Sequence, residues 1–103
     1  MIRVVFVALV ALMFGGPAMA QSIEQMAGQM IVVGFKGDDV TDASVKALIA
    51  EVASGGIGGV MYLKTNVKSL EAVKAMNAAF RAASPDLPPF LTLDQEGGKV
   101  QRL

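Results

Sequence analysis

The residues best suited to chemistry lie in one stretch, residues 93–103, where an apolar run passes directly into carboxylates, two glycines and two cations. Asp94 comes first after the apolar run, and a carboxylate there can accept hydrogen bonds from vicinal hydroxyls of a sugar. Arg102 offers a planar fork of donors. Gly97 and Gly98 allow the backbone to pass close to a ligand. The stretch therefore predicts a site for a small polar ligand, with Asp94 and Arg102 as substrate-binding residues.

Two other interpretations of this stretch stay open on the residues alone. Asp94 and Glu96 could be the acid and the nucleophile of a glycosidase, whose carboxyl groups lie about 5 to 5.5 Å apart in a retaining enzyme. Two positions apart on one loop, however, they would not reliably flank a scissile bond. Alternatively, both carboxylates belong to a solvated turn and pair with Lys99 and Arg102.

Other kinds of site find little support in the composition. The chain has no histidine and no cysteine, which excludes Ser-His-Asp and Cys-His nucleophiles within it and removes the usual zinc ligands. Asp38, Asp39 and Asp42 are typical of loop and helix-cap chemistry and lack the alternating oxygen ligands of a calcium loop. The formal net charge is zero, so nothing indicates nucleic-acid binding. We expect no metal and no cofactor.

A glycine cluster at residues 55–59 also needs an explanation. A phosphate-cradling loop follows a strand and opens a helix. Here Gly55 and Gly56 follow a helical pattern, and Gly58 and Gly59 open an apolar run. The order is therefore reversed, and we interpret the cluster as a helix stop followed by close backbone packing.

Three apolar runs predict the strands that must position the site. Met30 to Phe35 is nearly continuous and rich in β-branched residues, which is typical of a strand buried on both faces. Ile57 to Leu63 predicts the second strand and Phe90 to Leu93 the third. The segment 84–89 holds three prolines and cannot continue a helix.

Amphipathic stretches predict helices between these runs. Ser22 can cap a short helix from Ile23 toward Gly28, with Glu24 in its first turn. Thr41 or Asp42 can cap a second helix, and Ser69, after a loop at residues 64–68, a third that runs to about Ala83. The expected apolar faces consist of Val45, Leu48, Ile49 and Val52 in the second helix and of Leu70, Val73, Met76 and Phe80 in the third.

The order strand, helix, strand, helix, strand predicts an α/β fold with a parallel sheet. Both a doubly wound sheet and a (β/α)8 barrel begin in this way, and both bind ligands at the carboxyl ends of their strands. Residues 94–102 follow the third strand at that end.

The first twenty residues have the features of a secretory signal peptide. Arg3 supplies a positive charge, residues 4–14 are an uninterrupted apolar run, and Ala18-Met19-Ala20 is a cleavage pattern. The apolar run is shorter than the roughly 20 residues of a spanning helix. We expect cleavage after Ala20, a domain over residues 21–103, no stable membrane anchor, and export to the periplasm or the medium.

The sequence resembles glycoside hydrolase family 3, in particular its β-N-acetylhexosaminidase branch. The third strand of that branch ends in Asp-Gln-Glu-Gly-Gly-Arg-Val-Gln-Arg, and residues 94–102 match it except that Lys99 replaces an arginine. Residues 28–35, 56–60 and 66–85 resemble the family as well.

The resemblance implies a (β/α)8 barrel of TIM type, of which this chain holds the first three strands and two helices. It implies retaining hydrolysis of terminal non-reducing β-N-acetylglucosamine from peptidoglycan fragments or chito-oligosaccharides. Asp94 and Arg102 match the positions that hold the non-reducing sugar, and no role is assigned to Glu96 or Lys99. The family's nucleophilic aspartate and its histidine-aspartate pair follow motifs that these 103 residues lack. We therefore expect no catalytic residue within the chain, which reads as an amino-terminal fragment that is inactive alone. The alternative is a small exported sugar-binding or interaction domain.

Overall fold

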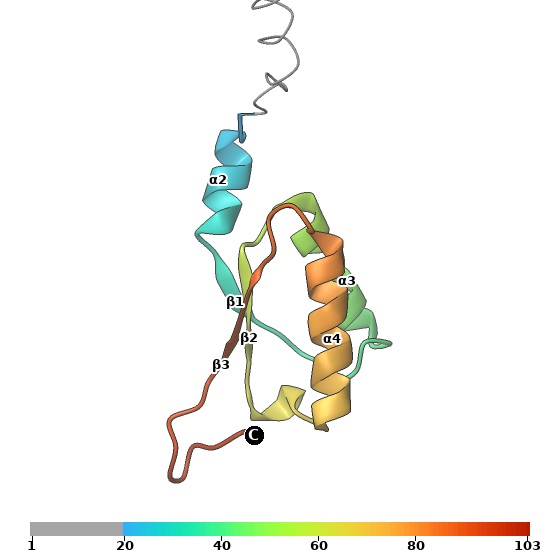
Figure 1. Ribbon diagram of the computed structural model, residues 1–103, viewed down its shortest axis with the longest axis vertical. Helices are drawn as coiled ribbons and strands as arrows, with labels where there is room; N and C mark the ends of the chain where they lie inside the picture. The colour runs from blue at the N-terminus through green and yellow to red at the C-terminus, as the bar shows by residue number, and fades with distance from the viewer. Residues whose placement is uncertain (1–19) are drawn as a thin grey trace, which may run out of the picture.

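The computed structural model describes residues 20–103, which contain a three-stranded sheet and two long helices. Figure 1 shows these helices on one side of the sheet. The predicted signal peptide lies outside the described residues, apart from Ala20. In chain order the elements are α2 (Ile23–Gln29), β1 (Val32–Gly34), α3 (Ala43–Ser54), β2 (Gly59–Tyr62), the 3-10 helix η1 (Lys64–Asn66), α4 (Leu70–Ala83) and β3 (Phe90–Leu93). Within this part of the chain, no helix is both long and apolar enough to cross a membrane.

The sheet is parallel throughout, with β2 between β1 and β3. Gly59 of β2 pairs with Val32 on one side and Phe90 on the other, and Met61 pairs with Gly34 and Thr92. The predicted α/β fold with three parallel strands is confirmed.

The strand limits agree with the prediction only in part. β3 has the predicted limits, whereas the first two strands are shorter than the predicted ranges 30–35 and 57–63. Met30 is the C-cap of α2, and the Ile31 carbonyl accepts hydrogen bonds from the amides of Gly58 and Gly59. The first residue of the apolar run, Met30, therefore belongs to the end of α2, and regular strand pairing starts only at Val32.

The hydrophobic core lies between the sheet and helices α3 and α4. Phe35, which follows β1, contacts Tyr62 and Phe80 edge-on, with ring centroids 5.1 and 5.9 Å apart. Leu48 and Ile49 pack against this core as predicted. Its buried members are Val45, Val52, Val60, Tyr62, Val73, Met76 and Phe80.

Leu70 does not join that core, and its prediction is wrong. Its side chain is 50% exposed because it is the first residue of α4, one turn before the buried part of the helix begins at Val73. Ser69 caps α4 as predicted, its hydroxyl accepting a hydrogen bond from the Ala72 amide. The predicted loop at residues 64–68 contains η1.

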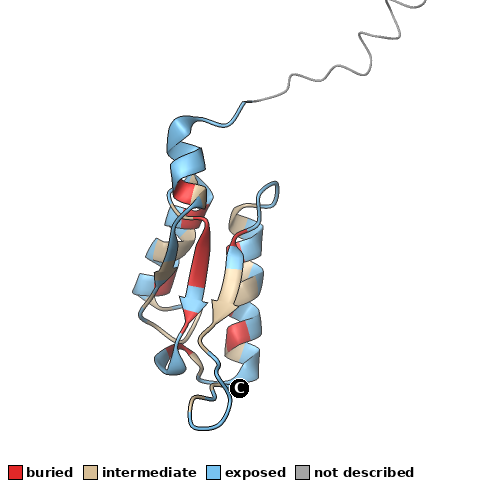
Figure 2. Cartoon of the chain, turned by 90° about the vertical axis from the view of Figure 1, so that its left-hand side faces the viewer, coloured by how far each residue is buried: buried red, intermediate tan, exposed pale blue. Residues whose placement is uncertain are grey.

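The opposite face of the sheet is turned toward the viewer in Figure 2, with no described element in front of it. Val32 is 45% exposed, Met61 39% and Phe90 69%. The prediction that the first strand is buried on both faces is therefore wrong for this structure. The reason is that α3 and α4 both lie on the other face, and no described element covers this one.

The glycine cluster is structural, as predicted. Gly55 ends α3 in the left-handed conformation, with a φ of 79°. Gly58 packs directly against the backbone of Gln29, where a side chain would not fit. Gly28 does not end α2, contrary to the prediction, because the helix continues to Gln29. Instead Gly28 is buried against the Gly55 carbonyl, which joins α2 to the end of α3.

Candidate functional site

The predicted site residues begin where β3 leaves the sheet. The Asp94 amide donates to the Tyr62 carbonyl at 3.0 Å, which continues the pairing of β3 with β2 by one residue. Asp94 is thereby fixed by its backbone at the carboxyl end of the sheet. The residues after it, 95–103, form a loop that extends beyond the strands (Figures 1 and 2). We call residues 94–103 the carboxyl-end loop.

A tight turn reverses the carboxyl-end loop. The amides of Glu96 and Gly97 donate to the Val100 carbonyl at 2.9 and 3.0 Å, and the Val100 amide donates back to Gly97 at 3.1 Å. Gly97 and Gly98 have φ values of 79° and 56°, a region of backbone conformation that residues with a Cβ disfavour. A Cβ on either would meet no described, non-neighbouring atom within 4 Å. Their conformation, rather than a crowded backbone, is therefore what requires glycine here.

The turn brings Arg102 back to Asp94. The Arg102 Nη2 lies 2.9 Å from the Asp94 Oδ2, and the side chains are 17% and 33% exposed. Both predicted substrate-binding residues therefore meet in one ion pair. The other carboxylate oxygen of Asp94 accepts no hydrogen bond from a described residue, and the buried Arg102 Nε has no partner among residues 20–103. The pair keeps both acceptor and donor capacity.

Glu96 and Lys99 take no part in this pair. Both side chains are exposed, and neither forms an ion pair with a described residue. Of the solvated turn considered above, only the contact between Asp94 and Arg102 is present. Glu96 also lies on the arm of the loop that leaves the sheet, while the pair closes the base of the loop.

Asn66 supports the same end of the sheet and was not predicted from the sequence. It is fully buried. Its Oδ1 accepts the Leu63 amide at 2.8 Å, and its Nδ2 donates to the carbonyls of Phe35 and Gly37 at 2.9 and 2.8 Å. Asn66 thus joins the segment after β1 to the segment after β2. A single asparagine in a polar segment gives no sequence signal of such burial.

The acidic segment at residues 38–42 uses its carboxylates on its own backbone. Asp42 is the N-cap residue of α3, but its carboxylate accepts the amides of Asp38 and Asp39 at 2.9 and 3.2 Å. Hydrogen bonds from the Thr41 amide and hydroxyl lower the pKa of Asp39. These contacts are the loop chemistry that the sequence predicted.

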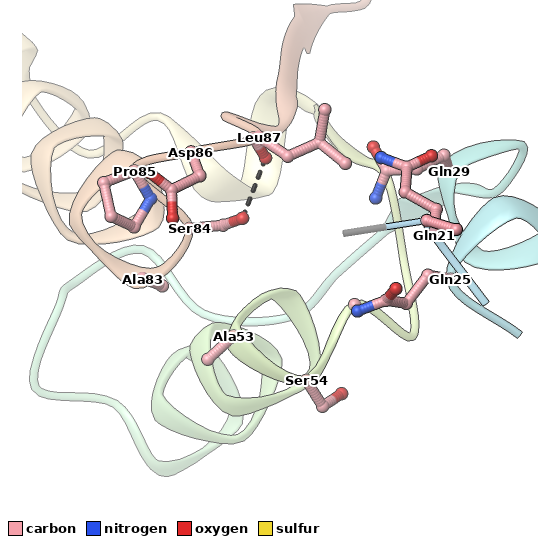
Figure 3. Close-up of a pocket in the computed structure, with 12 residues that line it drawn as sticks. Gln21, Gln25, Gln29, Ala53, Ser54, Ala83, Ser84, Pro85, Asp86 and Leu87 are labelled. Carbon is pink, nitrogen blue, oxygen red and sulfur yellow. Dashed lines mark hydrogen bonds between the residues drawn. The ribbon is translucent and has the colours of Figure 1, made fainter. Parts of the chain in front are cut away.

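A hollow of about 520 Å³ lies at the other end of the sheet, beside α2 and the segments that precede β2 and β3. In Figure 3 the side chains of Gln21, Gln25 and Gln29 face residues 84–87 across it. The Ser84 hydroxyl donates to the Leu87 carbonyl at 2.8 Å. None of the predicted site residues lines this hollow.

Comparison with known proteins connects the chain to one group of enzymes. Beta-hexosaminidases of Xanthomonas campestris pv. campestris (strain B100) and Stenotrophomonas maltophilia (strain K279a) are 46% and 37% identical to it over 73 residues. A solved glycoside hydrolase family 3 beta-N-acetylglucosaminidase from Paenibacillus sp. str. FPU-7 superposes over 82% of the chain, with a TM-score of 0.66 and 30% identity. The chain corresponds to part of the amino-terminal domain of glycoside hydrolase family 3.

The family predicted from the nine-residue motif is thereby confirmed. No protein-family model matches the sequence. The two beta-hexosaminidases match 71% of this chain but only 20% of their own length is covered, and the chain covers 16% of the solved structure. The relatives therefore establish the glycosidase family. The activity and the substrate of the whole protein are proposed below.

Proposed function

We propose that this chain is the sugar-holding part of an exported β-N-acetylhexosaminidase. The observation that carries the proposal is the Asp94–Arg102 pair, which lies at the carboxyl end of a parallel strand in a chain related to family 3. That end of the sheet is where α/β folds bind their ligands.

The pair has the chemistry that a terminal sugar needs. In our proposal, the free oxygen of Asp94 accepts hydrogen bonds from neighbouring hydroxyls of a non-reducing β-N-acetylglucosamine, because an ionised carboxylate only accepts. Arg102 orients the carboxylate, and its remaining N–H groups donate to the same ring. The relatives' names support a hexosamine, and we propose peptidoglycan fragments or chito-oligosaccharides as its source.

We further propose that the three strands belong to a (β/α)8 barrel. An exposed inner face, helices on the outer face and two unpaired strand edges support this arrangement, since barrel closure would cover the face and pair both edges. The retaining chemistry would use a nucleophile and an acid/base pair from outside these 103 residues. The chain contains no histidine, and we propose that alone it binds the sugar without cleaving it.

Export remains part of the proposal. The apolar run and the Ala-x-Ala pattern of residues 1–20 support a signal peptide followed by a domain at residues 21–103. The protein would then act in the periplasm or outside the cell.

A titration of the full chain with N-acetylglucosamine, followed by amide chemical shifts, tests the proposal. We expect saturable shifts at Asp94 and Arg102 in the wild type and none in Asp94→Asn. Shifts that are absent from the wild type, or equal in Asp94→Asn, would contradict it. Incubation with p-nitrophenyl N-acetyl-β-glucosaminide should release no p-nitrophenol, and turnover would refute the proposed inactivity.

A self-contained sugar-binding domain is the second candidate. The observation in its favour is the continuous core that the chain forms between the sheet and the two helices, with Phe80 and Met76 fully buried. Both candidates predict sugar binding, so the observation that would favour the second is a cooperative thermal transition of the chain in the absence of sugar. Without such a transition, the chain needs further segments to fold.

A further inference from the structure

Gln95 makes a contact that explains how the two ends of the carboxyl-end loop are held together. Its side-chain Oε1 accepts hydrogen bonds from the backbone amides of Arg102 and Leu103, at 2.9 and 3.1 Å. Gln95 is adjacent in sequence to Asp94, so a single oxygen fixes the backbone of one member of the ion pair beside the other.

The other hydrogen bonds of the loop do not hold the backbone of Arg102 beside Asp94. The turn from Gly97 to Val100 is closed by backbone hydrogen bonds, but these act at the far tip. The Gln95 amide donates to the Leu93 carbonyl at 3.0 Å, which fixes the first arm against the end of β3. Among residues 20–103, the Gln95 side chain makes the only hydrogen bonds to the backbone amides of Arg102 and Leu103, and so connects the end of the returning arm to this fixed point.

Without that connection, the pair would depend on the arginine side chain alone. An arginine has many rotamers, and a partly exposed ion pair gains little from holding one of them. With the Arg102 backbone fixed, fewer of its side-chain conformations lead away from Asp94, so more of the molecules present a formed site.

We propose that Gln95 is a positioning residue of the sugar site: it contacts no sugar and holds Arg102 against Asp94 through two backbone amides. This inference rests on the proposed function for its effect on binding, although the contact itself does not. It also explains why an amide side chain is placed between two carboxylates in residues 94–96.

A direct contact with the sugar is the competing explanation. The Gln95 side chain is exposed, and its Nε2 donates to no described residue. The two explanations use opposite halves of the same amide: positioning needs the oxygen, whereas a direct contact would use the NH2 group.

Two substitutions separate these halves in the full chain. Gln95→Met keeps the length of the side chain and removes both polar atoms, whereas Gln95→Glu keeps an accepting oxygen and removes the NH2 donor. Gln101→Met is the matched control, because Gln101 lies in the same loop and, within the described chain, its side chain forms a single hydrogen bond, to the Leu103 carbonyl at 3.3 Å.

The first readout needs no sugar. Amide hydrogen exchange at Arg102 and Leu103 should become about 5- to 10-fold faster in Gln95→Met, as expected when an acceptor worth roughly one neutral hydrogen bond is lost. The exchange rates of both amides should stay near wild type in Gln95→Glu. In Gln101→Met, the exchange rate of the Arg102 amide should stay near wild type. Unchanged exchange in Gln95→Met overturns the positioning role, whether or not the chain binds sugar.

The second readout is the Kd for N-acetylglucosamine. We expect Gln95→Met to raise it about 10-fold, with Gln95→Glu within about threefold of wild type, since the acceptor is kept. Equal losses in the Met and Glu variants would show a direct contact and overturn the proposal. If the wild type binds no N-acetylglucosamine, the proposed function fails, and the exchange result alone decides whether Gln95 positions Arg102.

Discussion

The sheet and its two helices differ from the carboxyl-end loop in what holds them together, although the two regions are continuous at Leu93. In the first region, Phe80, Met76 and Val60 are fully buried and the contacts are apolar. In the second, side-chain oxygens, a glycine turn and one ion pair fix residues that are mostly exposed. Packing responds to lost volume, whereas the loop responds to lost donors and acceptors. Substitutions in the first region should therefore change stability, and those in the second should change binding.

The largest effect is expected in the core. Phe80→Ala should lower the free energy of unfolding by about 3 to 5 kcal/mol, because it removes a fully buried ring that also contacts Phe35. Urea denaturation followed by circular dichroism measures the change. Leu70→Ala in the same helix is the control, since Leu70 is 50% exposed, and it should cost less than about 1 kcal/mol. Similar losses at both positions would show that the core is not packed as described.

Gly28→Ala should give the next largest effect. A methyl group there would collide with the Gly55 carbonyl, so α2 must move away from the end of α3, at a cost of about 1 to 3 kcal/mol. Gly97→Ala is the matched comparison from the loop. Its Cβ would meet open space, but its φ of 79° is unfavourable for alanine, which costs about 1 kcal/mol.

The two glycine variants should also differ in where they act. Amide exchange should increase around Ile31 and Gly58 in Gly28→Ala, and around Val100 in Gly97→Ala, because these amides lie next to the altered contacts. A global loss of protection in Gly97→Ala would contradict the independence of the loop from the core.

Tyr62 makes the core sensitive to high pH. Burial raises the pKa of Tyr62 to about 12 from its usual value of 10, and its hydroxyl donates to the Asn77 Oδ1 at 2.8 Å. The folded state therefore holds this proton more tightly than the unfolded state does. The resulting stability is complete below pH 10 and is lost as the pH rises through 12, by about 3 kcal/mol in all.

Tyr62→Phe isolates this effect, because it removes only the phenol hydroxyl. The difference in unfolding free energy between wild type and variant should shrink between pH 10 and 12. Tyr62 is the only tyrosine and the chain has no tryptophan, so ultraviolet absorbance reports its ionisation directly. A pKa near 10 in the folded chain would contradict the buried position.

The same contrast explains what the sequence could predict. Helical spacing predicted Val45, Val52, Val73, Met76 and Phe80, and the proline-bounded run predicted β3 with its observed limits. Such patterns succeed because burial on one face imposes a period on the sequence. They fail at Leu70, because the spacing of apolar residues does not show where the buried part of a helix begins. They fail in the first strand, because that spacing does not show how many faces of the sheet are covered.

The positions of the candidate site residues in the fold were also predictable in part, but for a different reason. The order of the elements placed Asp94 at the carboxyl end of β3, and the family motif pointed to Arg102. The contacts of Gln95 and Asn66 could not be predicted, since each joins atoms of segments that only the folded chain brings together. Gly28 shows the same limit: the sequence suggested a helix end, and the structure shows a close contact with Gly55.

The smallest change in stability is expected for the ion pair itself. Arg102→Lys should alter the free energy of unfolding by less than about 1 kcal/mol, because both side chains are partly exposed and such pairs contribute little. Binding of N-acetylglucosamine should nevertheless weaken about 10-fold, since lysine lacks the planar fork that can hold Asp94 and still donate to a sugar. Lys99→Arg is the control: it restores the family's arginine at an exposed turn position without an ion pair in the described chain, and it should change neither quantity. A variant at Arg102 that lost stability and kept its affinity would reverse the contrast between packing and binding from which these predictions follow.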